Sequence, residues 1–311
     1  MAKPHPAIGG IRLVLGGNVF GWTIGRDKSF EVLDAFYEAG GRMIDTAEGY
    51  TSWIAGNKGG ESETVLGEWM ENRNVRSDML VGTKTGMGGP PGALAPDKVA
   101  AAIDGSLDRL RTDYVDLYYA HRDEPLTPLD EVAGAFVETV TSGKARSLGA
   151  SNYTAARLAE LTDAAEAAGG PGFTVMQPEY NLVSRSQYEG ALQNLCVARG
   201  IAVMPYFGLA SGFLSGKYRD ASDWTGSTRA YALDAAAAAG GWDVLAAVDE
   251  VARDTGAAHA EIALAWINAQ PGIAAPLASA TSVEQLADLV KAVSLELAPE
   301  HLAKLDAALP R

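Results

Sequence analysis

Cysteine and histidine are scarce in this 311-residue sequence, which contains one cysteine and four histidines. The lone Cys196 cannot form an internal disulfide, and its place in a helix-like run predicts a small buried side chain rather than a reactive thiol. His5, His259 and His301 have no cysteine, aspartate or glutamate at metal-ligand spacing, so we expect surface positions for them and no metal site. These shortages argue against disulfide scaffolds and zinc modules.

Positive charge and long apolar runs are lacking as well. The chain has 25 lysines and arginines against 39 aspartates and glutamates, which gives a net charge of −14 and a pI near 4.7. This charge opposes binding to nucleic acid or to anionic membrane surfaces. No segment approaches the roughly 20 apolar residues that span a bilayer, and the start MAKPHPAIGG has no apolar signal core. We therefore expect a cytoplasmic protein with neither kind of partner.

The composition that is present suits a soluble globular protein with a large core, because 47% of residues are hydrophobic and 21% are charged. No linker, low-complexity tract or block of like charge marks a second domain. We expect one domain over residues 1–311, and no feature of the sequence indicates its oligomeric state.

Short β-rich runs recur about every thirty residues, each followed by a helical pattern, which predicts parallel strands joined by crossover helices. An open doubly wound sheet usually carries GxGxxG after its first strand, and that motif is absent. The pattern therefore favours the α/β class and a closed (β/α)8 TIM barrel. The predicted strands are Val14–Gly17, Arg42–Asp45, Met79–Thr83, Val115–Ala120, Ser147–Ser151, Val175–Gln177, Ala202–Tyr206 and Ile273–Pro276.

Helical periodicity lies between these runs. Asp97 is a plausible N-cap for a helix whose buried face consists of Val99, Ile103, Ser106, Leu107 and Leu110. A second, alanine-rich helix is expected over 154–168. The interval between Tyr206 and Ile273 has room for a long loop and for helices near 243–254 and 260–269.

Four polar residues follow the predicted strands, where the active site of such a barrel lies: Asp45, Lys84, His121 and, five residues after Asp45, Tyr50. Each alone has an ordinary structural explanation, such as a helix cap, a solvated lysine or a packed tyrosine. Together they suggest chemistry. A lysine ammonium lowers the pKa of a neighbouring phenol, Asp45 would keep Lys84 charged, and His121 can donate a hydrogen bond to a substrate oxygen.

The motifs around these residues resemble those of the aldo-keto reductase superfamily along nearly the whole chain. DTAEGY, GESETVLGEW, VGTKTG, SLDRLRTDYVDLYYAH, LGASNY, MQPEYN, GLASGFLSGKY and TSVEQL occur in the family's order. The resemblance implies a (β/α)8 barrel, hydride transfer between a nicotinamide and a carbonyl or alcohol substrate, and a catalytic tetrad of Asp45, Tyr50, Lys84 and His121.

The same resemblance implies the cofactor site. Ser151, Asn152 and Gln177 would bind the nicotinamide carboxamide, and Tyr206 would stack on the ring. Glycines in the loop after the seventh strand permit close approach to a pyrophosphate, Lys217 would neutralise it, and Arg229 is a candidate for the 2′-phosphate. The remaining expected cofactor contacts are Trp22, Phe207, Gly208, Leu209, Gly212, Ser279, Thr281, Gln285 and Asp288.

Some positions depart from the family pattern. Gly208 replaces a common proline, Ser279 a common glycine and Leu289 a common asparagine, while Thr281 stands where many relatives carry arginine. We expect NADPH as the cofactor, with NADH less favoured.

The insertion WIAGNKGG begins at Trp53, which we expect to line the substrate pocket with Trp22 and Tyr153; aromatic side chains there suit an apolar or sugar-like face. Two alternatives stay open. Lys84 could be the Schiff-base lysine of an aldolase, and the motifs also resemble potassium-channel β-subunits, which bind cofactor and regulate a membrane partner. Neither the carbonyl substrate nor the preferred direction follows from the sequence.

Overall fold

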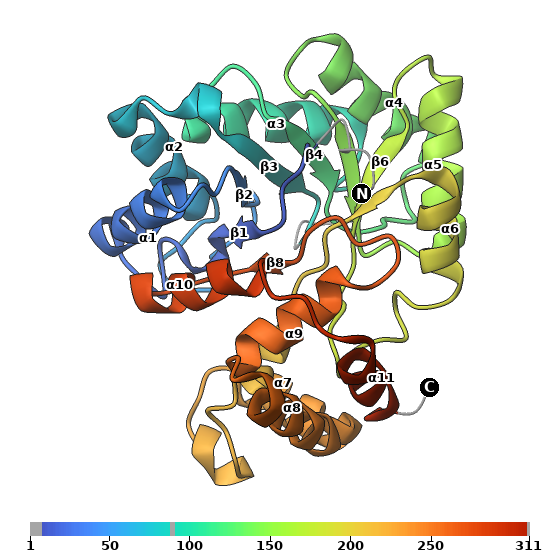
Figure 1. Ribbon diagram of the computed structural model, residues 1–311. Coiled ribbons are helices and arrows are strands. Elements are labelled where there is room, and N and C mark those ends of the chain that lie inside the picture. The colour runs from blue at the N-terminus through green and yellow to red at the C-terminus, as the bar shows by residue number, and fades with distance from the viewer. Residues whose placement is uncertain (1–7, 88–90, 310–311) are drawn as a thin grey trace.

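The computed structural model describes residues 8–87 and 91–309, and its centre is an eight-stranded parallel sheet (Figure 1). The strand order is β7-β6-β5-β4-β3-β2-β1-β8. The strands are β1 Val14–Gly16, β2 Met43–Asp45, β3 Leu80–Thr85, β4 Leu117–Ala120, β5 Leu148–Ser151, β6 Phe173–Gln177, β7 Ala202–Val203 and β8 Leu277–Ala278.

The sheet is curled, and its first strand pairs with its last. Val14 of β1 pairs with Leu277 of β8 in parallel register. At the other end of the strand order, Val203 of β7 forms an isolated parallel bridge with Ile273, just before β8. The amide of Ala274 donates to the carbonyl of Val203 at 2.8 Å, so backbone hydrogen bonds also connect β7 with the segment that leads into β8.

Seven predicted strands overlap observed ones, but the prediction for the last was wrong. Residues Ile273–Pro276 were expected, whereas β8 is Leu277–Ala278. Pro276 has no N–H with which to extend a ladder, so regular pairing with β1 starts only after it. β7 is also shorter than predicted, and Pro205 imposes the same limit there.

Helices α1 to α6 follow one another around the sheet, and α7, α8, α9 and α11 gather on one side of it (Figure 1). Their bounds are α1 Arg26–Glu38, α2 Glu61–Arg73, α3 Pro96–Leu110, α4 Leu129–Thr141, α5 Ala155–Ala167, α6 Ala191–Arg199, α7 Ala230–Ala236, α8 Trp242–Thr255, α9 His259–Asn268, α10 Val283–Ala292 and α11 Pro299–Ala307.

The predicted buried face of α3 is confirmed, since all five of its residues are buried. Its N-cap is wrong: the helix begins at Pro96 after Ala95, and Asp97 lies in the first turn, where its charge still suits the helix dipole. The alanine-rich helix is confirmed as α5, and the Thr154 hydroxyl caps it by accepting a hydrogen bond from the amide of Arg157 at 3.3 Å.

The interval after β7 contains more structure than predicted. Helices α8 and α9 confirm the two expected ones, but the preceding loop folds into 3-10 turns at Ala210–Ser215 and Ala221–Trp224 and into α7. An aromatic cluster holds this segment together, because Trp224 stacks on Trp242 at 5.8 Å and Phe213 packs against both.

The buried apolar side chains within 8–87 and 91–309 form two clusters, as alternation along parallel strands predicts. One cluster lies between the sheet and the helices. The other contains inward-facing strand residues, among them Val14, Met43, Tyr119, Val175 and Leu277. A side chain at Gly149 would overlap the Tyr119 ring at 2.5 Å, so this glycine makes room for the largest residue of the inner cluster.

Cys196 is buried in α6, as predicted, and burial raises the pKa of its thiol to about 12. The surface positions expected for two histidines were wrong: His259 and His301 are half-buried, and His259 Nε2 lies 2.5 Å from Asp249. His5 lies outside the described residues. Among the residues described, no helix is both long and apolar enough to cross a membrane.

Candidate active site

Strand alternation places the predicted catalytic residues at the carboxyl end of the sheet interior. Met43 and Val175 face the inner cluster, so Asp45 and Gln177, two residues later on the same strands, also point inward. Lys84 occupies the equivalent end of β3. Parallel strands present their carboxyl ends at one edge of the sheet, where active sites of such folds lie.

Lys84, Asp45 and Tyr50 form a hydrogen-bonded trio. The Lys84 ammonium donates to an Asp45 carboxylate oxygen, to the Thr46 carbonyl at 2.8 Å and to the Tyr50 hydroxyl oxygen at 2.8 Å. The Tyr50 hydroxyl in turn lies 3.4 Å from the same Asp45 oxygen. The side chains of Lys84 and Asp45 are fully buried, so each ion depends on the other for compensation.

This environment shifts the pKa values of Lys84 and Tyr50, and the shift of Tyr50 is opposite to the one expected. Burial lowers the pKa of Lys84, and the charge of Asp45 opposes that shift. Burial raises the pKa of Tyr50 well above its ordinary value, and the Asp45 charge adds to the rise. The expected lowering of the Tyr50 pKa was therefore wrong for this protein, because burial and, after it, the Asp45 charge both raise that pKa.

His121 follows β4 and completes the group, with its ring 6.0 Å from the Tyr50 ring. Burial lowers the pKa of His121 well below its ordinary value, and the charges of Lys84 and Arg122 act in the same direction. The imidazole is consequently neutral near pH 7, and Nδ1 has no hydrogen-bond partner among the described residues. A neutral imidazole presents one N–H donor.

A second set of hydrogen bonds connects the residues predicted to hold the nicotinamide. The Ser151 hydroxyl donates to the backbone carbonyl of Gln177 at 2.7 Å, and the Asn152 amide nitrogen donates to Ser151 Oγ at 3.0 Å. Tyr206 donates to Asn152 Oδ1 at 2.8 Å, and Gln177 Nε2 donates to Asp45 at 2.9 Å. The structure thus brings these four residues together next to the trio.

The predicted phosphate loop has an unusual backbone. Phe207, Ala210 and Ser211 all have positive φ, a conformation that non-glycine residues adopt only under tertiary constraint and that gathers at functional sites. A side chain at Gly208 would come within 2.9 Å of Leu264 in α9, which accounts for glycine there. Leu209 and Gly212 belong to the same turn, and the amide of Gly212 donates to the Leu209 carbonyl at 2.8 Å.

Lys217 is exposed and Arg229 half-buried, and neither has an acidic partner within 8–87 and 91–309. In a chain of net charge −14, two cations without carboxylate partners after β7 fit an anionic ligand such as a dinucleotide phosphate. The remaining predicted contacts lie near β8 and α10. Ser279 Oγ lies 2.5 Å from Asn18 Oδ1, and Thr281 donates to Gln285 Oε1 at 2.9 Å.

Asp288 lies farther along α10, 3.6 Å from Lys291. Leu289 is buried in the same helix.

Aromatic side chains continue outward from Tyr50. The Trp53 ring lies 6.4 Å from the Tyr50 ring, and the Trp22 ring 6.0 Å from Trp53, both pairs edge to face. Trp53 is 57% exposed, so its ring is accessible beside Tyr50. Tyr153, the third predicted substrate contact, is buried, and its hydroxyl has no partner in the described part of the chain.

Two further residues near Lys84, Glu63 and Tyr119, were not predicted from the sequence. Buried Glu63 of α2 accepts hydrogen bonds from Thr83 at 2.5 Å and from Arg109 at 2.7 Å, and its charge, like that of Asp45, opposes the lowering of the Lys84 pKa by burial. The Tyr119 ring lies 5.7 Å from Lys84 Nζ. A usable signal existed for Tyr119, which lies in β4 two residues before His121, so alternation points the two side chains to the same side.

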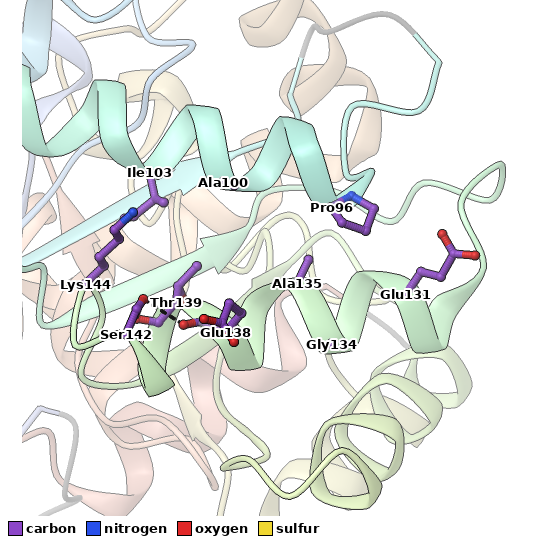
Figure 2. A pocket seen from close by; sticks show the side chains of 10 residues that line it. All are labelled: Pro96, Ala100, Ile103, Glu131, Gly134, Ala135, Glu138, Thr139, Ser142 and Lys144. Atoms are coloured by element: carbon purple, nitrogen blue, oxygen red, sulfur yellow. Dashed lines mark hydrogen bonds between the residues drawn. The ribbon is translucent and has the colours of Figure 1, made fainter.

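A hollow of about 350 Å³ lies elsewhere, between α3 and α4 (Figure 2). Ala100, Ile103 and Ala135 form its apolar floor, with Glu131 and Lys144 at its edges. None of the predicted catalytic or cofactor residues lines it, so it is separate from the site at the strand ends.

Comparison with known proteins agrees with this geometry. The sequence model of the aldo/keto reductase family matches residues 12–310. The chain is 31% identical to the uncharacterized oxidoreductase YrpG of Bacillus subtilis, across 96% of this chain and 92% of the relative.

Two further relatives have names that are more specific. The aryl-alcohol dehydrogenase [NADP(+)] of Phanerodontia chrysosporium is 28% identical, across 93% of this chain and 77% of the relative. A probable voltage-gated potassium channel subunit beta of Oryza sativa is 30% identical, across 93% of this chain and 89% of the relative. The family match, the parallel sheet with its helices and the oxidoreductase relatives agree. The chain belongs to the aldo/keto reductase family, and it is an oxidoreductase.

Proposed function

We propose that the protein reduces an aldehyde or ketone to the alcohol with NADPH, and that Tyr50 donates the proton. The hydrogen bonding of Tyr50 carries this proposal. Its oxygen accepts from Lys84, which leaves its own O–H available, and the neighbouring Asp45 oxygen at 3.4 Å is a weak acceptor. The hydroxyl can therefore turn to a substrate oxygen without losing a strong hydrogen bond.

Each neighbour has a separate role in this proton transfer. Lys84 places its positive charge against the Tyr50 oxygen and stabilises the phenolate that remains after transfer. Asp45 keeps the buried Lys84 protonated. His121, neutral because of its depressed pKa, donates a hydrogen bond that orients the carbonyl and stabilises negative charge on its oxygen.

The cofactor supplies hydride to the carbonyl carbon when it is bound. Ser151, Asn152 and Gln177 offer amide and hydroxyl groups for the nicotinamide carboxamide, and Tyr206 offers an aromatic face. Lys217 and Arg229 suit its phosphates, and Arg229 is our candidate for preferring NADPH to NADH. The hydrogen bonds among the first four residues, which preorganise them, support this assignment.

We also propose that the curled sheet closes into a (β/α)8 barrel that forms a single domain. The backbone hydrogen bonds between Val203 and Ala274, and from Leu277 to the Pro205 carbonyl at 2.9 Å, support closure. The inner apolar cluster is what a closed barrel of this size contains. The cytoplasmic location stays a prediction.

The alternatives have less support. A Schiff-base lysine must be unprotonated and reachable, whereas Lys84 is fully buried and paired with Asp45. A regulatory role is suggested by the name of the rice relative, and it would combine cofactor binding with little turnover.

The test is a panel of aldehydes and ketones with NADPH consumption as the readout. We expect turnover with at least one aldehyde, and reversal with the matching alcohol and NADP⁺. Cofactor binding without turnover on any carbonyl would favour the regulatory alternative. Borohydride trapping of a carbonyl adduct on Lys84 would favour the aldolase.

A further inference from the structure

Gln177 of β6 donates a hydrogen bond from Nε2 to Asp45 Oδ2 at 2.9 Å, across 132 positions of sequence. Both side chains are almost completely buried, with 2% and 0% exposure. We propose that Gln177 is a positioning residue for proton transfer, which holds the Asp45 carboxylate and thereby sets the acidity of Tyr50. This inference rests on the proposed function, and it adds a role to a residue otherwise expected to contact only the cofactor.

The Asp45 carboxylate divides its two oxygens between two tasks. Oδ1 accepts from Lys84 and faces the Tyr50 hydroxyl, while Oδ2 accepts from Gln177. Because Asp45 has no exposed surface, water cannot replace a lost donor. A buried carboxylate without that donor is destabilised and free to rotate, and its rotation would disturb the contact with Lys84.

Gln177 is itself held from the nicotinamide side of the site. Ser151 Oγ donates to the backbone carbonyl of Gln177 at 2.7 Å, Asn152 donates to Ser151, and Tyr206 donates to Asn152. These hydrogen bonds lead from Tyr206, after β7, through β5 to the backbone of Gln177 on β6, whose side chain then contacts Asp45 on β2. These contacts connect the residues expected to bind the nicotinamide with the residues proposed to deliver the proton.

The hydrogen bond from Gln177 should lower the pKa values of both Lys84 and Tyr50. The Gln177 amide is neutral, but its N–H points positive charge at Asp45 and offsets part of the carboxylate charge. Without it, Lys84 and Tyr50 experience a more negative neighbour, and the pKa of each rises. Tyr50 then becomes a weaker acid. The titratable groups around this point are Asp45, Tyr50, Glu63, Lys84, Tyr119 and His121.

The first experiment tests the contact in the cofactor-free protein. Gln177→Met keeps the length of the side chain and removes its N–H, and we expect it to lower the thermal midpoint by about 2–4 °C. In an Asp45→Asn background the same change should cost less than half as much, because the charged acceptor is gone. Equal losses in both backgrounds would overturn the proposed contact. Gln177→Asn, one methylene shorter, replaces Gln177→Met if that variant does not fold.

The second experiment measures hydride transfer in a single turnover, with NADPH saturating, as a function of pH. Gln177→Met should slow the step about tenfold, since hydrogen bonds to charged groups are worth that much, and should move its alkaline limb to higher pH. The matched control is Tyr206→Phe, which removes a hydroxyl from the same proposed nicotinamide site but not from Asp45. It should change NADPH affinity or rate without moving the limb.

The outcomes separate this inference from the proposed function. A slower step with an unmoved alkaline limb would mean that Gln177 only orients the cofactor, and the positioning role would be wrong. A wild-type protein that reduces no carbonyl compound would instead remove the proposed function, while the thermal experiment would still report on the contact between Gln177 and Asp45.

Discussion

The Nζ atom of Lys84 lies 2.8 Å from the Tyr50 oxygen and 4.6 Å from the centre of the Tyr50 ring. One buried cation therefore stabilises both the lone pair and the π face of the same phenol. This contact joins residues 34 positions apart in the sequence, and it is the observation on which the proposed acid role of Tyr50 depends.

Replacing Tyr50 with phenylalanine removes the hydroxyl and keeps the ring against Lys84. General acid catalysis contributes about 10²–10⁴-fold, so turnover should fall by at least that order while NADPH affinity stays near normal. Single-turnover hydride transfer is the measurement, because slow product release would otherwise mask the loss. Retention of more than about a tenth of the wild-type rate would contradict the acid role.

From about pH 6.5 upward, the rate of carbonyl reduction should show a single change with pH, a fall on the alkaline side. The pKa of Lys84 is below its ordinary 10.5, that of Tyr50 is well above 10, and that of His121 is well below 6.5. Reduction should therefore be flat from about pH 6.5 to neutrality and decline on the alkaline side as Lys84 loses its proton. The Lys84→Met variant should be slow at every pH and lack the limb. A limb that persists in this variant would assign it to another group.

Cofactor preference should depend on Arg229. If its guanidinium binds the 2′-phosphate, Arg229→Ala should weaken NADPH binding by about 10- to 100-fold and leave NADH binding nearly unchanged. Arg219→Ala is the matched control, because Arg219 lies in the same segment but is already engaged by Asp249 at 2.8 Å. Fluorescence titration with both cofactors measures the effect, and equal wild-type affinities for the two would remove this assignment.

The sequence predicted that Asp45, Lys84 and His121 lie close together because each stands at or just after the carboxyl end of a strand, and the strand ends of a parallel sheet converge whatever the loops do. Asp45, Lys84 and His121 need only the strand assignment to be placed. The contact from Gln177 to Asp45 is different in kind. It depends on the inward tilt of side chains from strands that are not neighbours, which no local pattern contains.

The Tyr50 pKa, the backbone of the loop after β7 and the position of β8 could not be predicted from the sequence, for related reasons. The pKa of Tyr50 is raised by its burial and by its closeness to Asp45, and both depend on three-dimensional packing that the sequence does not show. The positive φ values at Phe207 and Ser211 oppose the residues' own preferences, so tertiary packing alone selects them. β8 was misplaced because apolar residues before Pro276 resemble a strand, although the proline delays the ladder.

Trp53 should determine which carbonyl compounds the protein prefers. Its exposed ring stands edge to face with both Tyr50 and Trp22, so a planar aromatic substrate approaching the Tyr50 hydroxyl would contact it. Aromatic contacts are worth about 0.5–1.5 kcal/mol, or roughly 2- to 12-fold. Trp53→Ala should lower kcat/KM for benzaldehyde by that factor and change the value for cyclohexanecarbaldehyde, similar in size but not planar, by much less.

The ratio of the two kcat/KM values is the quantity to compare, because it cancels any general disturbance of Tyr50 and the different intrinsic reactivities of the two aldehydes. Trp53→Phe should restore most of the ratio. Tyr231→Ala is the control: Tyr231 is 78% exposed on α7 and has no ring contact in the described part of the chain. A ratio in Trp53→Ala that equals the wild-type value would show that the substrate does not reach this ring, and the insertion after Tyr50 would then have no part in specificity.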